Sequence, residues 1–308
     1  MVAVGKVALG FAAALLLAGP ASAACEGRVI PDKVMNAPLC LPASPHRIVV
    51  LDATFSLGMA LELGMPVIGA PLAGMTDTAL HAEAEKAGVA DLGSMLEPSI
   101  ESVVALQPDL IIGASFAAAP YYDMLSMIAP TALIDVTDWK EFYATVAAIG
   151  GREAQVGDLF AAYDRRIADI RARVPDIEVS ILRITSWDFQ VYLDGPVSYA
   201  PFTVLREAGV RRTDYETTTD DTSMKRPDWE ELTRLDGDIL LYIIGGLNPS
   251  DTDGRHEEVL SNPLWRMLPA VRAGNVHRVD AGTWMEFSGL ASAHRVLDDV
   301  ERYILPPP

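Results

Sequence analysis

Hydrophobic and polar positions follow two alternating patterns over most of the chain. Short apolar runs at residues 47–51, 67–70 and 110–113 are typical of strands buried on both faces of a sheet. Apolar residues at helical spacing follow the first of these runs, from residue 56 to 63, and Gly64 ends that pattern. The alternation predicts an α/β layer built on a mainly parallel sheet.

The longest helix is predicted near the middle of the chain. Between residues 153 and 174 apolar residues recur at helical spacing for about six turns, and Pro175 ends the pattern. A second α/β series follows, with strands expected at 179–182, 190–193, 239–242 and 276–279 and a closing amphipathic helix at 292–303. We therefore expect two α/β lobes joined by a single long helix. The expected boundaries are 24–152 for the N-terminal lobe, 153–175 for the joining helix and 176–308 for the C-terminal lobe.

The two expected lobes share a sequence unit. Residues 100–111 lie in register with residues 229–240, and each segment has the pattern of a short helix, a tight turn and a buried strand. Acidic residues match as well, among them Asp109 and Asp238. A repeat on both sides of a central helix favours two similar lobes. A ligand is then expected at their interface, where clefts preferentially form.

The beginning of the chain has the pattern of a cleaved secretory signal. Lys6 is the only charge in the first 24 residues, an apolar run covers residues 7–17, and small residues at 21–23 suit a signal peptidase. We predict a signal peptide at residues 1–23 and export to the periplasm. The alternative is an uncleaved membrane anchor, but the apolar run is shorter than the roughly 20 residues that a spanning helix needs.

Cys25 and Cys40 are the only cysteines, and both fall at the start of the mature chain. In an oxidising compartment such an isolated pair most simply forms one disulfide. Closing a loop of this size stabilises the fold by about 3 kcal/mol in the chain-entropy model. The alternative is a lipidated Cys25, although Ser22 stands where lipoprotein signals usually carry an aliphatic residue. We favour the disulfide, and with it a periplasmic protein over a lipoprotein.

Composition and charge narrow the possible functions. Half of the residues are hydrophobic and 21% are charged, so a sizeable core is expected, and the formal net charge of −18 disfavours nucleic acid and anionic membranes as partners. The sequence contains no nucleophile elbow, phosphate loop or dinucleotide-binding glycine pattern, and its five histidines are scattered. We expect no catalytic residues, no metal site and no resident cofactor, and hence a protein that is not an enzyme. We also expect the protein to be a monomer.

Several short motifs occur in a recognisable order. They are the stretches at 45–51, 61–64, 67–69, 92–93, 97–101, 106–112, 262–265, 271–274, 276–279 and 283–284. Across residues 43–305 this ordered set resembles the helical-backbone class of substrate-binding proteins of iron-siderophore and cobalamin ABC importers, and within it the ferric-citrate and ferrichrome binding proteins. The resemblance implies two α/β lobes joined by one helix, with limited closure on a ligand held between them. It also implies a ferric siderophore or similar chelate as cargo.

The resemblance further implies that Glu101 and Glu230 are exposed and dock onto arginines of the importer's permease dimer. With one acid on each lobe, docking would depend on the distance between the lobes, and the charge contacts would orient the protein on the permease. For either glutamate alone, a solvated helix face is the alternative. Their matched register in the repeat favours docking.

A ferric siderophore arrives with its iron already wrapped by oxygen atoms, so its binding site needs aromatic walls, hydrogen bonds and cations rather than metal ligands. Such groups belong in loops that follow strands. The ligand-binding residues predicted on this basis are Thr54, Met95, Phe116, Trp187, Met224, Lys225, Arg226 and Trp284. For Phe116, Trp187, Met224, Lys225 and Trp284, ordinary packing is the alternative.

Two of these positions, Met95 and Trp284, match ligand contacts of the hydroxamate-binding members that the chain resembles. Those members carry an arginine where Met95 stands here. Its absence argues against a ferrichrome-like ligand and leaves Lys225, Arg226 or Arg183 as substitutes.

Heme or cobalamin is the alternative ligand within the same importer class. Heme would require an axial tyrosine or histidine, for which Tyr121, Tyr122 and Tyr199 are candidates. A periplasmic sensor or interaction module with the same fold is an alternative from a different class. A periplasmic hydrolase is disfavoured because no nucleophile–base pair is visible.

Overall fold

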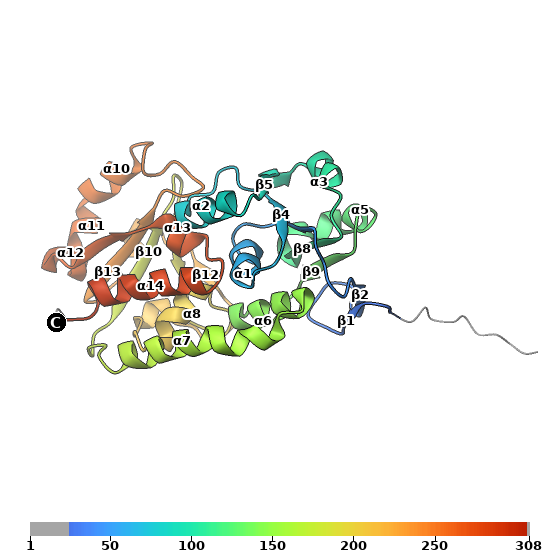
Figure 1. Cartoon of the computed structure of the whole chain (residues 1–308). Helices are drawn as coiled ribbons and strands as arrows, with labels where there is room; N and C mark the ends of the chain where they lie inside the picture. The colour runs from blue at the N-terminus through green and yellow to red at the C-terminus, as the bar shows by residue number, and fades with distance from the viewer. Residues whose placement is uncertain (1–24, 307–308) are drawn as a thin grey trace, which may run out of the picture.

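The computed structural model describes residues 25–306 and places two α/β halves side by side (Figure 1). The sheet of the first half has the order β5-β4-β3-β8-β9, and all of its pairings are parallel. Its strands are β3 (Ile48–Val50), β4 (Val67–Ala70), β5 (Ala90–Asp91), β8 (Leu110–Ala114) and β9 (Thr131–Ile134). β3, β8 and β9 are buried throughout, and for β3 and β8 the continuous apolar runs predicted this burial.

Besides this sheet and an N-terminal hairpin, the described residues of the first half form six α-helices, one 3-10 helix (Ala119–Tyr121) and a second short hairpin. The helices are α1 (Ser56–Glu62), α2 (Thr78–Lys86), α3 (Ile100–Leu106), α4 (Ser115–Ala118), α5 (Tyr122–Ser126) and α6 (Trp139–Gly150). The hairpin consists of β6 (Gly93–Ser94) and β7 (Glu97–Pro98) and projects from the end of β5. It carries Met95 and Leu96 in its turn.

The second half contains a mixed sheet with the order β12-β11-β10-β13-β14. Its strands are β10 (Val179–Ile184), β11 (Phe189–Tyr192), β12 (Met224–Lys225), β13 (Ile239–Ile244) and β14 (Val276–Val279). β10, β13 and β14 are parallel, whereas β11 and β12 run antiparallel to their neighbours at one edge. Its helices are α8 (Ala200–Glu207), α9 (Trp229–Leu232), α10 (Arg255–Ser261), α11 (Pro263–Met267) and α12 (Pro269–Ala273).

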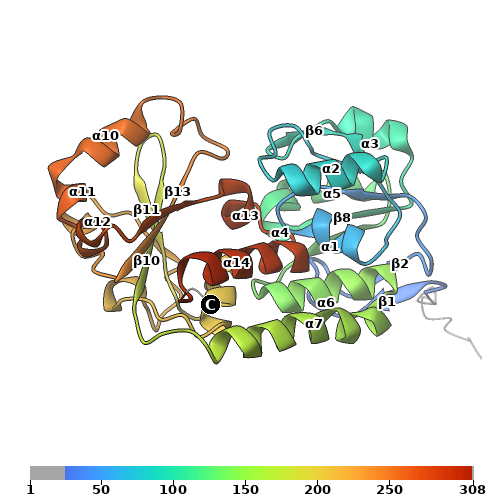
Figure 2. The ribbon, with the colours of Figure 1, turned by 60° about the vertical axis from the view of Figure 1, so that its left-hand side comes forward.

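The chain passes from the first half to the second through α7 (Glu153–Arg171), which has 19 residues. Figure 2 shows α7 along the base of the molecule. The helix ends earlier than expected, and the chain turns before Pro175. A proline disfavours the α conformation of the residue that precedes it, so the apolar spacing up to Val174 continued beyond the true helix end.

The C-terminal segment also connects the two halves. It forms α13 (Ala281–Met285) and α14 (Leu290–Tyr303), and α14 packs against α1 of the first half as well as against α7 and α8. One hydrophobic core consequently extends through both halves and includes Trp139, Phe202 and Phe287. Among residues 25–306, no helix combines the length and apolar character needed to cross a bilayer.

The sequence repeat is a structural repeat. The Asp109 carboxylate accepts hydrogen bonds from the backbone N–H groups of His46 (2.7 Å) and Arg47 (2.9 Å), just before β3. In the second half, Asp238 accepts from the backbone N–H of Glu178 at 2.9 Å, just before β10. Each aspartate therefore ties the start of one central strand to the start of its parallel neighbour.

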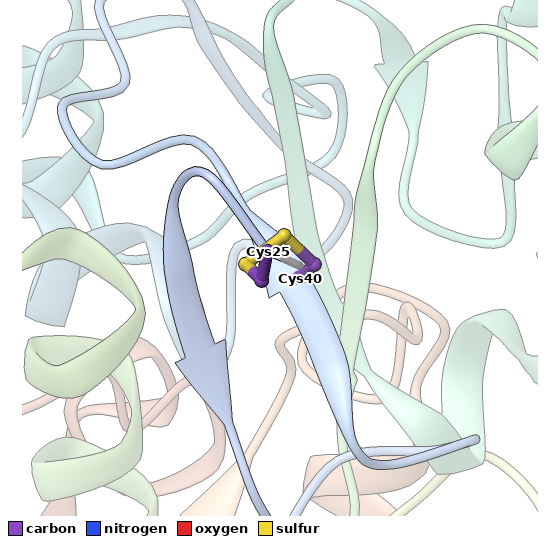
Figure 3. Close-up of a disulfide and its surroundings, with 2 residues drawn as sticks. All are labelled: Cys25 and Cys40. Atoms are coloured by element: carbon purple, nitrogen blue, oxygen red, sulfur yellow. A yellow bond between two sulfur atoms is a disulfide. The ribbon is translucent and has the colours of Figure 1, made fainter. Parts of the chain in front are cut away.

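The N-terminal arm is a hairpin closed by a disulfide. β1 (Arg28–Ile30) pairs antiparallel with β2 (Leu39–Leu41), and Cys25 is bonded to Cys40 with a Cα–Cα distance of 5.6 Å (Figure 3). The predicted disulfide is confirmed. The predicted signal peptide lies outside the described residues.

Candidate functional site

Two adjoining cavities lie between the halves. One of about 230 Å³ is lined by Thr54, Phe55, Met95, Arg183, Tyr192, Tyr199, Leu247, Met285 and Glu286. The other, of about 200 Å³, shares Thr54, Met95, Leu247 and Glu286 with the first and extends over Pro71, Ala73, Gly74 and Met75 to the β6–β7 turn. We call the two together the interlobe cavity. Side chains from both halves line it, as expected for a ligand site between lobes.

A buried carboxylate organises the first-half wall. Asp52 is fully buried, and its Oδ1 accepts from the backbone N–H groups of Phe55 (2.9 Å) and Ser56 (2.7 Å). Its Oδ2 accepts from the Ser56 hydroxyl (2.8 Å) and from the backbone N–H of Ala114 (3.0 Å). Burial raises the pKa of Asp52, and these hydrogen bonds oppose the rise. One side chain thus fixes both the loop that carries Thr54 and Phe55 and the start of α4.

Aromatic rings from the two halves meet at the cavity. Phe55 lies edge-on to Phe116 at a centroid distance of 5.2 Å and reaches Tyr199 of the second half at 6.1 Å. Tyr192 lies 5.8 Å from Tyr199 and stacks on Phe202 at 5.1 Å. The Tyr199 hydroxyl donates to the Met285 carbonyl oxygen at 3.1 Å, and burial raises the pKa of Tyr199. Such rings provide large apolar surfaces with polar edges.

Arg183 is the charged donor on the second-half wall. It lies on β10, and its Nη1 donates to Gln190 Oε1 (3.3 Å) and to the Tyr192 hydroxyl (3.2 Å). Its Nε is buried and has no acceptor among the described residues. The guanidinium is thus held in place by β11 while one of its donors stays unsatisfied.

A cluster of polar contacts, here called the interlobe clamp, joins the two halves beside the cavity and includes its lining residue Glu286. The buried Glu286 carboxylate accepts from the backbone N–H (2.8 Å) and hydroxyl (2.6 Å) of Thr76 and from the backbone N–H of Asp77 (2.8 Å). Arg295 of α14 pairs with the Asp77 carboxylate. A Cβ at Gly282 would lie 2.7 Å from the Asp77 Cα, so only glycine permits this approach of the two halves.

Three of the predicted ligand-binding residues lie in or beside the interlobe cavity. Thr54 and Met95 line it, and the Thr54 hydroxyl lies 3.2 Å from the Met95 sulfur. Phe116 is 71% exposed and contacts Phe55 at the margin. Of the cations considered as substitutes for the missing arginine, only Arg183 lines the cavity.

Four other predicted residues lie away from the cavity wall. Met224 and Lys225 form the outermost strand of the second sheet, and Lys225 Nζ donates to the Tyr215 carbonyl oxygen at 2.6 Å. Arg226 pairs with Asp188 on the surface, and Trp187 is 70% exposed in the β10–β11 loop. Because β11 and β12 form an antiparallel edge of the sheet, these residues lie on the outside of the second half. The cavity wall is formed instead by residues of β10 and β11.

The expectation that Trp284 lines the cleft is wrong. Its side chain is 0% exposed, and its indole Nε1 donates to Asp299 Oδ2 at 2.7 Å within the core. One turn of α13 directs Trp284 inward and leaves Met285 and Glu286 on the cavity side. Tyr192, Leu247 and Met285 were not predicted from the sequence. Tyr192 could have been found from its position near the end of a predicted strand, close to the loops in which ligand-binding residues were expected.

The two glutamates of the repeat occupy equivalent places. Glu101 and Glu230 are exposed in the first turns of α3 and α9. Ser99 caps α3 by accepting from the Ser102 N–H, and Asp228 caps α9 by accepting from the Glu230 N–H. Permease docking by these residues stays a prediction. Within residues 25–306, no group of three or more His, Cys, Asp and Glu residues is arranged to hold a metal ion.

Comparison with known proteins gives consistent matches over most of the chain. Residues 48–282 match the family model described as periplasmic binding protein. The probable siderophore-binding lipoprotein YfiY of Bacillus subtilis is 29% identical over 86% of this chain and 84% of its own length. The achromobactin-binding periplasmic protein of Dickeya dadantii is 30% identical over 70% of this chain and 72% of its own.

A solved structure with a similar fold is Staphylococcus aureus SirA in complex with staphyloferrin B. It superposes with a TM-score of 0.76 at 20% identity and covers 89% of this chain and 98% of that one. The likeness extends over both halves of the molecule.

Proposed function

Because the chain belongs to the periplasmic binding protein family, we propose that it captures a ferric siderophore or similar iron chelate and delivers it to the permease of an ABC importer. Membership of this family makes the chain an extracytoplasmic binding protein and not an enzyme. The siderophore-binding names of the similar proteins support an iron chelate as cargo. The observation that carries the proposal is the interlobe cavity, whose walls come from both halves.

The chemistry of the cavity supports a preassembled chelate. Such a cargo needs surfaces for its organic shell and few donors for its oxygen atoms. Phe55, Tyr192 and Tyr199 supply rings, and Met95 and Met285 supply polarizable apolar contacts. Typical cavities for ligands of this size measure about 300–1,000 Å³, so the cargo would occupy both adjoining volumes.

Two connections support limited closure around the cargo. We propose that α7 acts as the rigid linker between the lobes. The interlobe clamp adds a second constraint, because Glu286 and Arg295 hold the Thr76–Asp77 segment. Binding would then involve small adjustments at the mouth of the cavity rather than a large hinge motion.

Calorimetric titration tests the ligand class. The purified protein is titrated with ferrichrome, ferric citrate, ferric enterobactin, heme and cobalamin, and we expect saturable binding of at least one ferric chelate. Heme would be expected to need a free axial ligand, whereas the Tyr199 hydroxyl already donates to the Met285 carbonyl. Binding of heme with a shifted Soret band, together with no binding of any ferric chelate, would overturn the proposal.

The docking part of the proposal is tested by substitution of the two glutamates. Glu101→Ala combined with Glu230→Ala should leave chelate affinity unchanged and abolish uptake of iron-loaded chelate by cells that depend on this protein. Glu85→Ala combined with Glu231→Ala is the matched control, because both residues are exposed on helices of the two halves. Undiminished uptake by the first variant would contradict docking through Glu101 and Glu230.

A further inference from the structure

The interlobe cavity is lined by one positively and one negatively charged side chain. Among the described residues that line it, the charged side chains are Arg183 and Glu286. The Glu286 carboxylate already accepts hydrogen bonds from Thr76 and Asp77 in the clamp. Arg183 therefore supplies the single positive charge that remains available to a ligand.

Arg183 is held in place where its side chain lines the cavity. Its Nη1 is held by Gln190 and Tyr192 on the neighbouring strand, and its buried Nε has no acceptor among the described residues, so a ligand would meet the terminal nitrogens of the guanidinium. A guanidinium fixed in this way loses little side-chain entropy when it binds an oxygen. Hydrogen bonds from a charged donor in a partly buried site are stronger than those between neutral groups.

The rest of the wall favours an uncharged organic shell. It consists largely of apolar and aromatic side chains, namely Phe55, Met75, Met95, Leu96, Leu247 and Met285. Leu96 and Leu247 remain exposed at the mouth, one from each half. Contact with these surfaces stabilises apolar groups of a ligand in proportion to the area that they cover.

A strongly anionic chelate would lose the hydration of several charges in this cavity and gain a single cationic partner, Arg183. Each desolvated negative charge needs a cation or several donors to offset its lost hydration. The chain as a whole carries a formal net charge of −18, so its long-range field also opposes the approach of anions.

We infer that the cargo is an iron chelate with little or no net negative charge, which presents one oxygen-rich edge to Arg183 and apolar groups to the Phe55 and Leu247 sides of the cavity. This inference rests on the proposed function. The methionine at position 95 argued against a ferrichrome-like ligand, but Arg183 lines the same cavity as Met95 and can take the place of the missing arginine. Uncharged chelates are therefore among those that the site should accept.

The test is a calorimetric comparison at fixed ionic strength of ferrichrome, which is uncharged, ferrioxamine B, which is cationic, and the anionic ferric citrate and ferric enterobactin. We expect an uncharged or cationic chelate to bind at least about tenfold more tightly than either anionic one. Tightest binding of ferric citrate or ferric enterobactin would overturn the charge inference and leave the proposed function standing. Binding of none of the four would overturn the proposed function itself.

Substitution of the arginine sharpens the test. Arg183→Gln should weaken binding of the preferred chelate by about ten- to a hundredfold, which corresponds to a charge-assisted hydrogen bond. Arg226→Gln is the matched control and should leave affinity unchanged, because Arg226 pairs with Asp188 outside the cavity. Equal losses in the two variants would contradict a specific contact to Arg183. Thermal unfolding of both variants separates loss of contact from loss of fold.

Discussion

The two walls of the interlobe cavity are built differently. The described residues of the first-half wall are uncharged and sit in loops after parallel strands, and Asp52 holds the Thr54–Phe55 loop from behind. The second-half wall carries Arg183 and Glu286, and part of it comes from the faces of β10 and β11. The comparison indicates that the first half mainly sets the shape of the cavity and the second half sets its charge.

Removal of Asp52 should have the largest effect on stability, because it breaks the support of one wall. Asp52→Ala leaves buried donors at Phe55, Ser56 and Ala114 without their acceptor, and we expect the free energy of unfolding to fall by about 3–5 kcal/mol. Denaturant unfolding measures this loss. Asp52→Asn keeps one acceptor and should cost less. An equal loss in both variants would contradict a role for the hydrogen bonds.

The same residue gives a pH dependence. The pKa of Asp52 is raised in the folded state, so its contribution to stability is fully present below the ordinary aspartate value of about 3.9 and is lost as pH rises through the folded pKa. Asp52→Asn should remove this part of the slope of unfolding free energy against pH. An unchanged slope in Asp52→Asn would contradict the raised pKa.

Removal of Glu286 tests the joint between the walls and should have an intermediate effect. Glu286→Ala deprives the Thr76 and Asp77 amides of their acceptor, and we expect a loss of about 2–3 kcal/mol in unfolding free energy. Hydrogen exchange should accelerate at these two amides. Glu286→Gln retains an acceptor and serves as the control. Unchanged exchange in Glu286→Ala would show that the clamp does not hold the halves.

Substitution of Trp284 should have the smallest effect and leave both walls intact. Trp284→Phe removes the hydrogen bond to Asp299, and we expect a loss of about 1–2 kcal/mol in unfolding free energy with unchanged chelate affinity. Calorimetry and denaturant unfolding on the same samples separate the two effects. A loss of chelate affinity without a loss of stability would indicate that Trp284 contacts the ligand after all.

The difference between the walls also explains which parts of the site could be predicted from the sequence. In an all-parallel sheet, the loops after the strands meet at one edge, so Thr54 and Met95 were found from their positions after strands. The second sheet begins with an antiparallel β10–β11–β12 edge. In that sheet, the search for residues in loops next to strands selected Lys225 and Arg226, which lie away from the cavity.

The strands, the repeat and the disulfide followed from apolar runs, register and the isolation of two cysteines. The orientation of residues within one helical turn did not follow. Trp284 and Glu286 are two positions apart on and just after α13, and tertiary packing alone decides which of them faces the core. The clamp could not be predicted either, since Thr76 and Glu286 are 210 positions apart and share no sequence motif.

Hydrogen-exchange mass spectrometry with and without a bound ferric chelate tests the central claim most directly, namely that cargo is held between walls from both halves. The account predicts simultaneous protection of the 52–56 loop in the first half and of the 190–199 and 285–287 segments in the second. Protection confined to one half, or centred on β12 and its neighbours at the sheet edge, would contradict it.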